Sequence, residues 1–175
     1  MNPWHLTRRF LGSLPASPPD PADEAWAARV LEPGEHSLWV RLADRDRRHL
    51  VGVARRVEVA LAGTPHAGDP RWIAAALLHD AGKAEAGLGV AGRVVATLAG
   101  AAAPRRTRTW AGRPGYRGRI GRYLLHPDIG ARLVREVGGR SEVAVWAEVH
   151  QDPQRHGEAG FPAAVVEALT AADDG

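Results

Sequence analysis

The stretch DPRWIAAALLHDAGK, from Asp69 to Lys83, is the most informative part of this 175-residue sequence. Asp69-Pro70 is typical of a helix start, because aspartate caps free N–H groups and proline fits the first helical turn. Every residue from Ile73 to Leu78 is apolar, which places the helix predicted over residues 71–81 at the centre of a core. It ends in His79-Asp80. A carboxylate buried there requires a cation, since an unpaired buried charge is strongly destabilising.

The rest of the chain also predicts helices. Over residues 45–61, apolar side chains such as Leu50, Val53 and Val57 recur at three- and four-residue intervals, as a buried helical face requires. Further helices are predicted over residues 21–31, 35–42, 88–98, 116–125, 128–137, 141–151 and 162–172. Pro104 to Gly118 is predicted to be a loop, because it is rich in glycine, proline and arginine.

These patterns predict an all-α fold, a single-domain helical bundle, with residues 1–33 as an N-terminal extension containing a short helix. The chain has no cysteine, which excludes disulfides and thiolate metal sites and fits a reducing compartment. We find no signal-peptide pattern. The most apolar stretch, Leu88 to Pro104, is too short and too interrupted to span a bilayer. We therefore expect a cytoplasmic protein without a membrane partner.

Candidate metal ligands lie at or near the ends of the predicted helices. They are His49, His79, Asp80, His126, His150 and Asp173. Imidazole and carboxylate together form a ligand set for divalent Mn, Fe, Ni, Co, Mg or Zn, and the sequence does not distinguish among these ions. The HExxH and cysteine-based spacings of other zinc sites are absent. The four other histidines (His5, His36, His66 and His156) have no such setting and are expected at the surface.

Three stretches resemble the HD superfamily of metal-dependent phosphohydrolases. AAALLHDAGK (residues 74–83) resembles the signature helix of that family, RRHLVGVARRV (47–57) its first histidine helix, and ALTAADD (168–174) its closing aspartate motif. The resemblance implies an HD-type domain over residues 34–175. It also implies four primary metal ligands: His49, His79, Asp80 and Asp173. Asp174 is the neighbouring alternative to Asp173, and the small Ala172 directly before Asp173 favours Asp173.

Two further stretches resemble the HD-GYP branch, whose sites hold two metals. YLLHPDIGARLV (123–134) is similar to its His-Pro-x-x-Gly segment, and AEVHQD (147–152) to a segment with paired histidines, where Gln151 replaces the second one. HGEAGFP (156–162) departs from that branch's Asp-Gly-x-Gly-Tyr-Pro. The resemblance therefore implies one or two divalent ions, with His126 and His150 holding the second. The departures argue against cyclic-dinucleotide hydrolysis.

The chemistry implied is hydrolysis of a phosphate ester, of a nucleotide or a related small anion, by metal-activated water. Divalent ions lower the pKa of bound water and neutralise charge on phosphoryl oxygens. Asp80 would bridge two ions or bind one. Lys83, the only lysine, follows one helical turn later. We expect it to contact substrate phosphate or to steady the metal-bound water, so Asp80 and Lys83 are the candidate catalytic residues.

An arginine-rich segment, Pro104 to Tyr123, has seven arginines, no acidic residue, and Trp110 and Tyr116 between them. It would either cover an anionic substrate, with Arg117 and Arg122 as substrate-binding residues, or contact nucleic acid. The alternative function is a catalytically inactive, metal-binding regulatory module that holds a nucleotide or nucleic acid through this segment. A purely structural bundle is the third interpretation. The sequence leaves the oligomeric state open.

Overall fold

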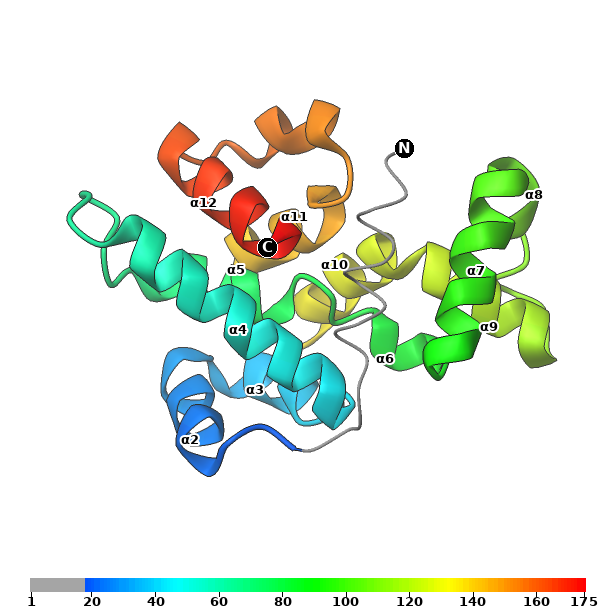
Figure 1. The fold of residues 1–175 in the computed structure, drawn as a ribbon, viewed down its shortest axis with the longest axis horizontal. Helices are drawn as coiled ribbons and strands as arrows, with labels where there is room; N and C mark the ends of the chain where they lie inside the picture. Colours follow the sequence, from blue (N-terminus) through cyan, green and yellow to red (C-terminus); the bar gives the residue numbers. More distant parts are fainter. Residues whose placement is uncertain (1–17) are drawn as a thin grey trace.

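In the computed structural model, which describes residues 18–175, every regular element is a helix (Figure 1). The elements are α2 (Pro21–Val30), α3 (Pro33–Trp39), α4 (Asp44–Leu61), α5 (Pro70–Leu78), α6 (Lys83–Ala86), α7 (Val90–Ala102), α8 (Pro104–Arg108), α9 (Gly115–Leu124), α10 (His126–Glu136), α11 (Ser141–Val149), the 3-10 helix η1 (Pro153–Ala159) and α12 (Ala163–Asp174). The all-α prediction is confirmed for these residues. None of their helices combines the length and apolarity needed to cross a membrane.

Helix α5 lies at the centre of the main core, as its apolar sequence predicts. All its residues from Trp72 to Leu78 are buried. The Asp69 carboxylate caps the helix by accepting a hydrogen bond from the Arg71 N–H at 2.9 Å. Helices α4, α11 and α12 pack around α5, and Figure 1 shows it between them. Any side chain at the end of α5 is therefore surrounded by three other helices.

Helix α4 packs against both α5 and α12. Its apolar face, which includes Leu50, Val53 and Val57, is buried against α5 and α12. The helix begins at Asp44, with Ala43 at the N-cap position. Because α4 packs on α12, residues near position 49 lie close to the C-terminal end of the chain.

The described part of the N-terminal extension packs on the main body. Asp20 caps α2 by accepting from the Ala22 N–H at 2.8 Å. Trp26 and Leu31 join the main core, and the guanidinium of Arg55 lies 3.6 Å from the centre of the Trp26 ring. The remainder of the predicted extension, and His5, lie outside the described residues.

Helices α7, α8 and α9 form a separate layer beside the main body, at the right of Figure 1. They have a small core of their own, made of Ala86, Leu88, Ala96 and Ile120. The prediction of a loop over Pro104 to Gly118 is wrong in part, because α8 lies inside it and α9 begins at Gly115. Pro104 suits the first turn of α8, and arginine is a good helix former. Gly112 and Pro114 lie in the turn between the two helices.

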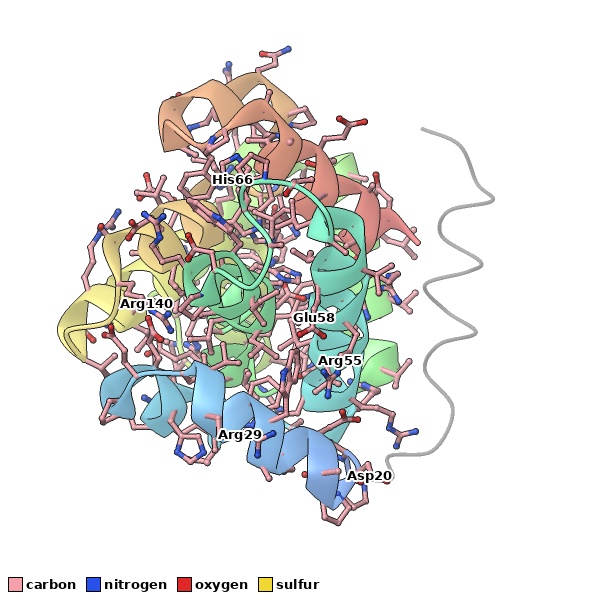
Figure 2. The ribbon with its side chains drawn as sticks, turned by 90° about the vertical axis from the view of Figure 1, so that its left-hand side faces the viewer. Asp20, Arg29, Arg55, Glu58, His66 and Arg140 are labelled. Carbon is pink, nitrogen blue, oxygen red and sulfur yellow. The ribbon has the colours of Figure 1, made fainter. Side chains whose placement is uncertain are left out.

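A buried ion pair joins α3 to the start of α11. Glu35 is fully buried, and its carboxylate accepts hydrogen bonds from the Arg140 backbone N–H and guanidinium. Figure 2 labels Arg140 on the left side of that view. Burial raises the pKa of Glu35, but the hydrogen bonds from Arg140 and Glu32 lower it more, so its pKa lies below the ordinary value. Glu35 is therefore a structural carboxylate, held ionised by Arg140.

Candidate metal centre

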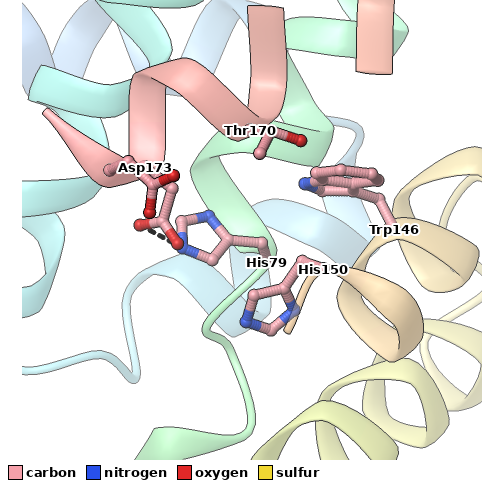
Figure 3. A pocket seen from close by; sticks show the side chains of 6 residues that line it. His79, Trp146, His150, Thr170 and Asp173 are labelled. Atoms are coloured by element: carbon pink, nitrogen blue, oxygen red, sulfur yellow. Dashed lines mark ion pairs between the residues drawn. The ribbon is translucent and has the colours of Figure 1, made fainter. Parts of the chain in front are cut away.

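The structure brings the six predicted ligands together from five helices: His49 lies within α4, and the other five lie at or near the ends of α5, α10, α11 and α12. On one side of the cluster, Oδ1 of Asp173 lies 3.5 Å from Nε2 of His49 and 3.4 Å from Nε2 of His79. Figure 3 shows His79 and Asp173 side by side, with dashed lines marking their ion pair. The neighbouring Asp174 is exposed. The geometry therefore favours Asp173 over Asp174 as the ligand.

Asp80 lies between this group and the other histidines. Its Oδ2 lies 3.6 Å from Nε2 of His79. Its Oδ1 lies 3.0 Å from Nε2 of His126 and 3.6 Å from Nε2 of His150. The two oxygens of one carboxylate thus face different imidazoles, so Asp80 could offer a ligand atom to either side of the cluster.

Three of the imidazoles are oriented by backbone carbonyls. In each, Nδ1 lies within hydrogen-bonding distance of the carbonyl oxygen three residues earlier: His79 to Ala76 at 2.9 Å, His126 to Tyr123 at 2.7 Å and His150 to Ala147 at 2.9 Å. A carbonyl only accepts, so Nδ1 carries the proton and Nε2 of the neutral ring presents its lone pair. Carbonyls near helix C-termini are free for this role. Each of these histidines lies at or just beyond the C-terminal end of a helix, where such a free carbonyl is within reach of its ring.

The lone pairs face carboxylate oxygens, which also only accept. Burial lowers the pKa of His126 to about 4 despite its contact with Asp80, so the ring is neutral at pH 7. Its Nε2 then faces Oδ1 of Asp80 with no proton between them. Nε2 of His79 and Oδ1 of Asp80 are both buried without a hydrogen-bond partner. Unpartnered acceptors in such a cluster fit a bound cation, and their chemistry suits a divalent metal.

The remaining charges keep the carboxylates ionised. Burial raises the pKa of Asp80, but the charges of Lys83 and His79 lower it more, so it lies well below the ordinary value. The pKa of Asp173 is also lowered: burial raises it, and the adjacent imidazoles of His49 and His79 outweigh that effect. Burial lowers the pKa of His79, and the two carboxylates raise it above its usual value. Both carboxylates are therefore ready to bind metal at neutral pH.

The three predicted substrate-binding residues lie in different settings. Lys83 is buried, and its ammonium contacts Oδ2 of Asp80. Arg122 donates to the backbone carbonyls of Glu85 and Ala111, at 3.0 and 3.2 Å. Arg117 is exposed, with its guanidinium 5.8 Å from the centre of the Trp110 ring. Only Lys83 thus contacts a residue of the metal-ligand cluster.

Arg93 is a charged residue near the cluster that the sequence reasoning missed. Its guanidinium donates to both oxygens of Asp46, at 2.5 and 2.6 Å, and lies 6.0 Å from the centre of the Tyr123 ring. Burial lowers the pKa of Arg93, but Asp46 raises it more, with smaller effects of Tyr123 and Asp80. The sequence feature that could have indicated this residue is Asp46, an acidic residue one helical turn before His49 on α4 that requires a basic partner. The pair fixes α7 against the helix that carries His49.

Two further residues near the cluster have specific contacts. The side-chain nitrogen of Gln151 lies 3.2 Å from Nε2 of His126. The prediction that His156 lies at the surface is wrong. It is buried, its Nε2 lies 3.2 Å from the carbonyl oxygen of His150, and its ring packs on Trp146. The reason is that η1 folds back onto α11.

Gly82 explains why a glycine follows the His-Asp pair. A Cβ at this position would lie 2.1 Å from the carbonyl oxygen of His126 and 2.7 Å from the backbone nitrogen of Gly130. Its φ of −64° is ordinary, so the constraint is close approach rather than backbone conformation. The glycine lets the residues after α5 contact the first turn of α10, which carries His126.

Gly82→Ala is therefore expected to lower both stability and metal affinity. Backbone atoms would have to shift, at a cost of about 1–3 kcal/mol, which lowers the melting temperature by about 2–4 °C per kcal/mol in a chain of this size. Thermal melts and calorimetric metal titrations measure both effects. Gly52→Ala on α4 is the matched control, because a Cβ there meets only Arg56 Nη1, at 3.5 Å. Equal melting temperatures and equal metal affinities of Gly82→Ala and Gly52→Ala would contradict the role given to Gly82.

A small hollow opens onto the cluster between α11 and α12. Its lining consists of His79, Trp146, His150, Thr170, Asp173 and Asp174 (Figure 3). The side chains of His49 and Asp173 are 47% and 28% exposed, whereas those of His79 and Asp80 are at most 5% exposed. Solvent therefore reaches the cluster from the His49–Asp173 side.

Comparison with protein-family models, with curated proteins and with solved structures finds no match for this chain.

Proposed function

We propose that this protein is a metal-dependent phosphohydrolase of the HD type, acting on a phosphate ester of a nucleotide or a related small anion. The observation that carries the proposal is the cluster of imidazole Nε2 atoms around two buried or half-buried carboxylates. Three of these rings have Nδ1 on a backbone carbonyl, so their lone pairs point inward. Such an arrangement is poor for the stability of the metal-free chain and suited to divalent ions.

The candidate ligands form two overlapping groups that share His79. His49, His79 and Asp173 would hold one ion, and His79, Asp80 and His150 a second, with His126 beside Asp80 at 3.0 Å. Bound divalent ions would supply an activated water and neutralise charge on a phosphoryl oxygen. The chain's own contribution is to keep its carboxylates ionised and its imidazoles oriented.

Positive side chains lie beside the proposed centre. Lys83 pairs with Asp80 and helps to keep it ionised. Arg93 lies near enough to Asp80 for the charge of the Asp80 carboxylate to raise the pKa of the Arg93 guanidinium. Phosphoryl transfer depends mainly on positioning and on positive charge around the phosphate. Because Lys83 is paired with Asp80 and Arg93 with Asp46, most of the positive charge that a substrate would meet comes from the bound ions, so we propose an anionic substrate.

The test is hydrolysis by the full chain of a panel of phosphomonoesters, nucleotides and cyclic nucleotides with Mn²⁺, Fe²⁺, Ni²⁺, Co²⁺, Mg²⁺ or Zn²⁺. We expect turnover of at least one substrate, its loss on chelation and its recovery when metal is restored. Metal content of gently purified protein is measured alongside. Bound metal without turnover of any substrate would contradict the enzyme proposal and favour the regulatory module. Absence of both metal binding and turnover would favour a purely structural bundle.

Metal binding is expected to release protons and to strengthen as pH rises through the neutral range. The pKa of His79 lies above its usual value, and its protonated ring cannot bind metal, so protons compete with the ion at lower pH. His126, with a pKa of about 4, is already unprotonated there. Calorimetric titrations at pH 6, 7 and 8, in buffers of different ionisation enthalpy, measure the released protons. An affinity independent of pH would count against His79 as a ligand.

A further inference from the structure

Charge is distributed unevenly along the chain. Residues 86–125, called here the basic lobe, contain eight arginines and no aspartate or glutamate. Since the whole chain has a formal charge of +3, the remaining residues carry −5. The basic lobe includes α7, α8 and α9, which lie together at one side of the molecule in Figure 1. The molecule therefore presents a positive region beside a negative body.

Three of the eight arginines are used inside the fold. Arg93 pairs with Asp46, Arg122 donates to two carbonyls, and Arg119 donates to the carbonyl of Ala86 at 3.2 Å. The other five are exposed on α8, on α9 and in the turn between them: Arg105, Arg106, Arg108, Arg113 and Arg117. These five are available to a ligand.

Few contacts within the described residues occupy these five guanidinium groups. Arg108 lies 3.3 Å from Asp128, and both side chains are more than half exposed, so this pair contributes little. Arg117 lies over the Trp110 ring. Arg105 and Arg106 are adjacent on α8 and exposed. The surface thus has a high density of positive charge that the fold itself does not use.

An aromatic side chain lies among these arginines. Tyr116 is 50% exposed and falls between Arg113 and Arg117 in the sequence. Trp110 is half-buried under Arg117. Guanidinium groups bind phosphate oxygens in pairs, and both guanidinium and aromatic faces stack on bases.

We propose that the basic lobe binds single-stranded nucleic acid through Arg105, Arg106, Arg113 and Arg117, with Tyr116 as a stacking platform. Stacking needs bases that are not paired in a duplex, which favours a single strand. A membrane surface fits less well, because membrane-bound amphipathic helices carry basic and apolar faces together. Here the exposed aliphatic residues Val95 and Leu98 lie on α7, whose only arginine is held by Asp46. This binding does not depend on hydrolysis at the metal centre.

The test is fluorescence anisotropy of a labelled single-stranded 20-mer, as DNA and as RNA, with the full chain in a chelating buffer. Chelation keeps the probe intact and separates this proposal from the proposed hydrolysis. We expect binding that weakens with salt, with a log–log slope of about −2 to −3.5 for three to five phosphate contacts. An absent salt dependence, or a preference for duplex over single strand, would overturn the proposal.

Charge-reversal variants locate the binding surface. R105E/R106E is expected to weaken binding by at least about tenfold through lost phosphate contacts. The control R29E/R41E makes the same change of charge at exposed positions outside the basic lobe, and Figure 2 labels Arg29 on α2. The affinity of this control variant for the oligonucleotide should remain within about twofold of that of the unmodified chain. Equal weakening by both variants would show a general charge effect and overturn the assignment.

The tyrosine and the choice of partner are tested separately. Tyr116→Leu removes the ring, and with it the hydroxyl that lies beside Gly92, and is expected to weaken binding by about fivefold or more through lost stacking. Thermal melts check that the variant is folded. Anionic phosphatidylserine vesicles are tested in parallel. Binding to the vesicles but not to the oligonucleotide, or an unchanged affinity of Tyr116→Leu, would overturn the proposal.

Discussion

Asp173→Asn is expected to lower metal affinity by more than about 100-fold, since loss of even an outer hydrogen-bond partner of a ligand costs about 10- to 100-fold. Hydrolytic activity should fall at least as far. The reason is geometric: Oδ1 of Asp173 faces Nε2 of both His49 and His79. Calorimetry with Mn²⁺ or Zn²⁺ measures the affinity. Asp174→Asn is the matched control, one residue away and exposed, and should remain within about twofold, as for a residue that touches no ligand.

Where the His79 ring is neutral, the same substitution should leave the metal-free chain as stable as before, or more stable. Where that ring is protonated, the substitution removes a favourable contact with the Asp173 carboxylate and should lower stability. An asparagine amide donates a hydrogen bond to an imidazole lone pair, which a carboxylate at 3.4 Å from Nε2 of His79 cannot do when that ring is neutral. Residues that serve a site often reduce stability. A large fall in the melting temperature of metal-free Asp173→Asn at a pH where His79 is neutral, or equal metal affinities of the Asp173 and Asp174 variants, would contradict the assignment.

The part of the fold predicted from sequence was the part with strong local signals. The apolar run from Ile73 to Leu78 predicted a buried helix, and α5 is buried along this run. The Asp69-Pro70 start is confirmed by the hydrogen bond that Asp69 accepts. The segment around α8 was harder, because proline and glycine suggest loops while arginine favours helix, and five residues show no periodicity.

The candidate site could be predicted as a set of residues but not as a network. Helix ends and apolar neighbours indicated the six candidate ligands. Sequence alone does not show that Asp46 holds Arg93, since this contact depends on how the chain folds back. The contact between Lys83 and Asp80 is local, because the two residues are three positions apart. The close approach of Gly82 to the His126 carbonyl is also a tertiary feature. Arg117 and Arg122 were chosen for their charge, and the fold uses Arg122 to hold carbonyls.

Arg140→Ala is expected to destabilise the fold by about 3–5 kcal/mol, because it leaves the Glu35 carboxylate buried without its cation. The variant also loses the hydrogen bond from Arg140 to the Val30 carbonyl at 3.0 Å. Urea denaturation measures the free energy of unfolding. Metal affinity of the folded fraction should be unchanged, since this pair joins α3 to α11 and contains none of the six ligands. The double variant E35Q/R140M should recover part of the loss, because no buried charge remains.

Arg140→Ala should also reverse the direction in which stability changes with pH, because it changes the sign of the pKa shift of Glu35. In the unmodified chain the pKa of Glu35 is lower in the folded state than its ordinary value of 4.5, so its contribution is present above that value and lost as pH falls through the folded pKa. Without Arg140, burial dominates and raises the folded pKa above the unfolded one. The buried carboxyl is then tolerated when protonated, and stability falls as pH rises from about 4.5 towards 7. Urea denaturation at pH 4, 5.5 and 7 distinguishes the two slopes. Parallel slopes for both proteins would mean that Arg140 is not what keeps Glu35 ionised.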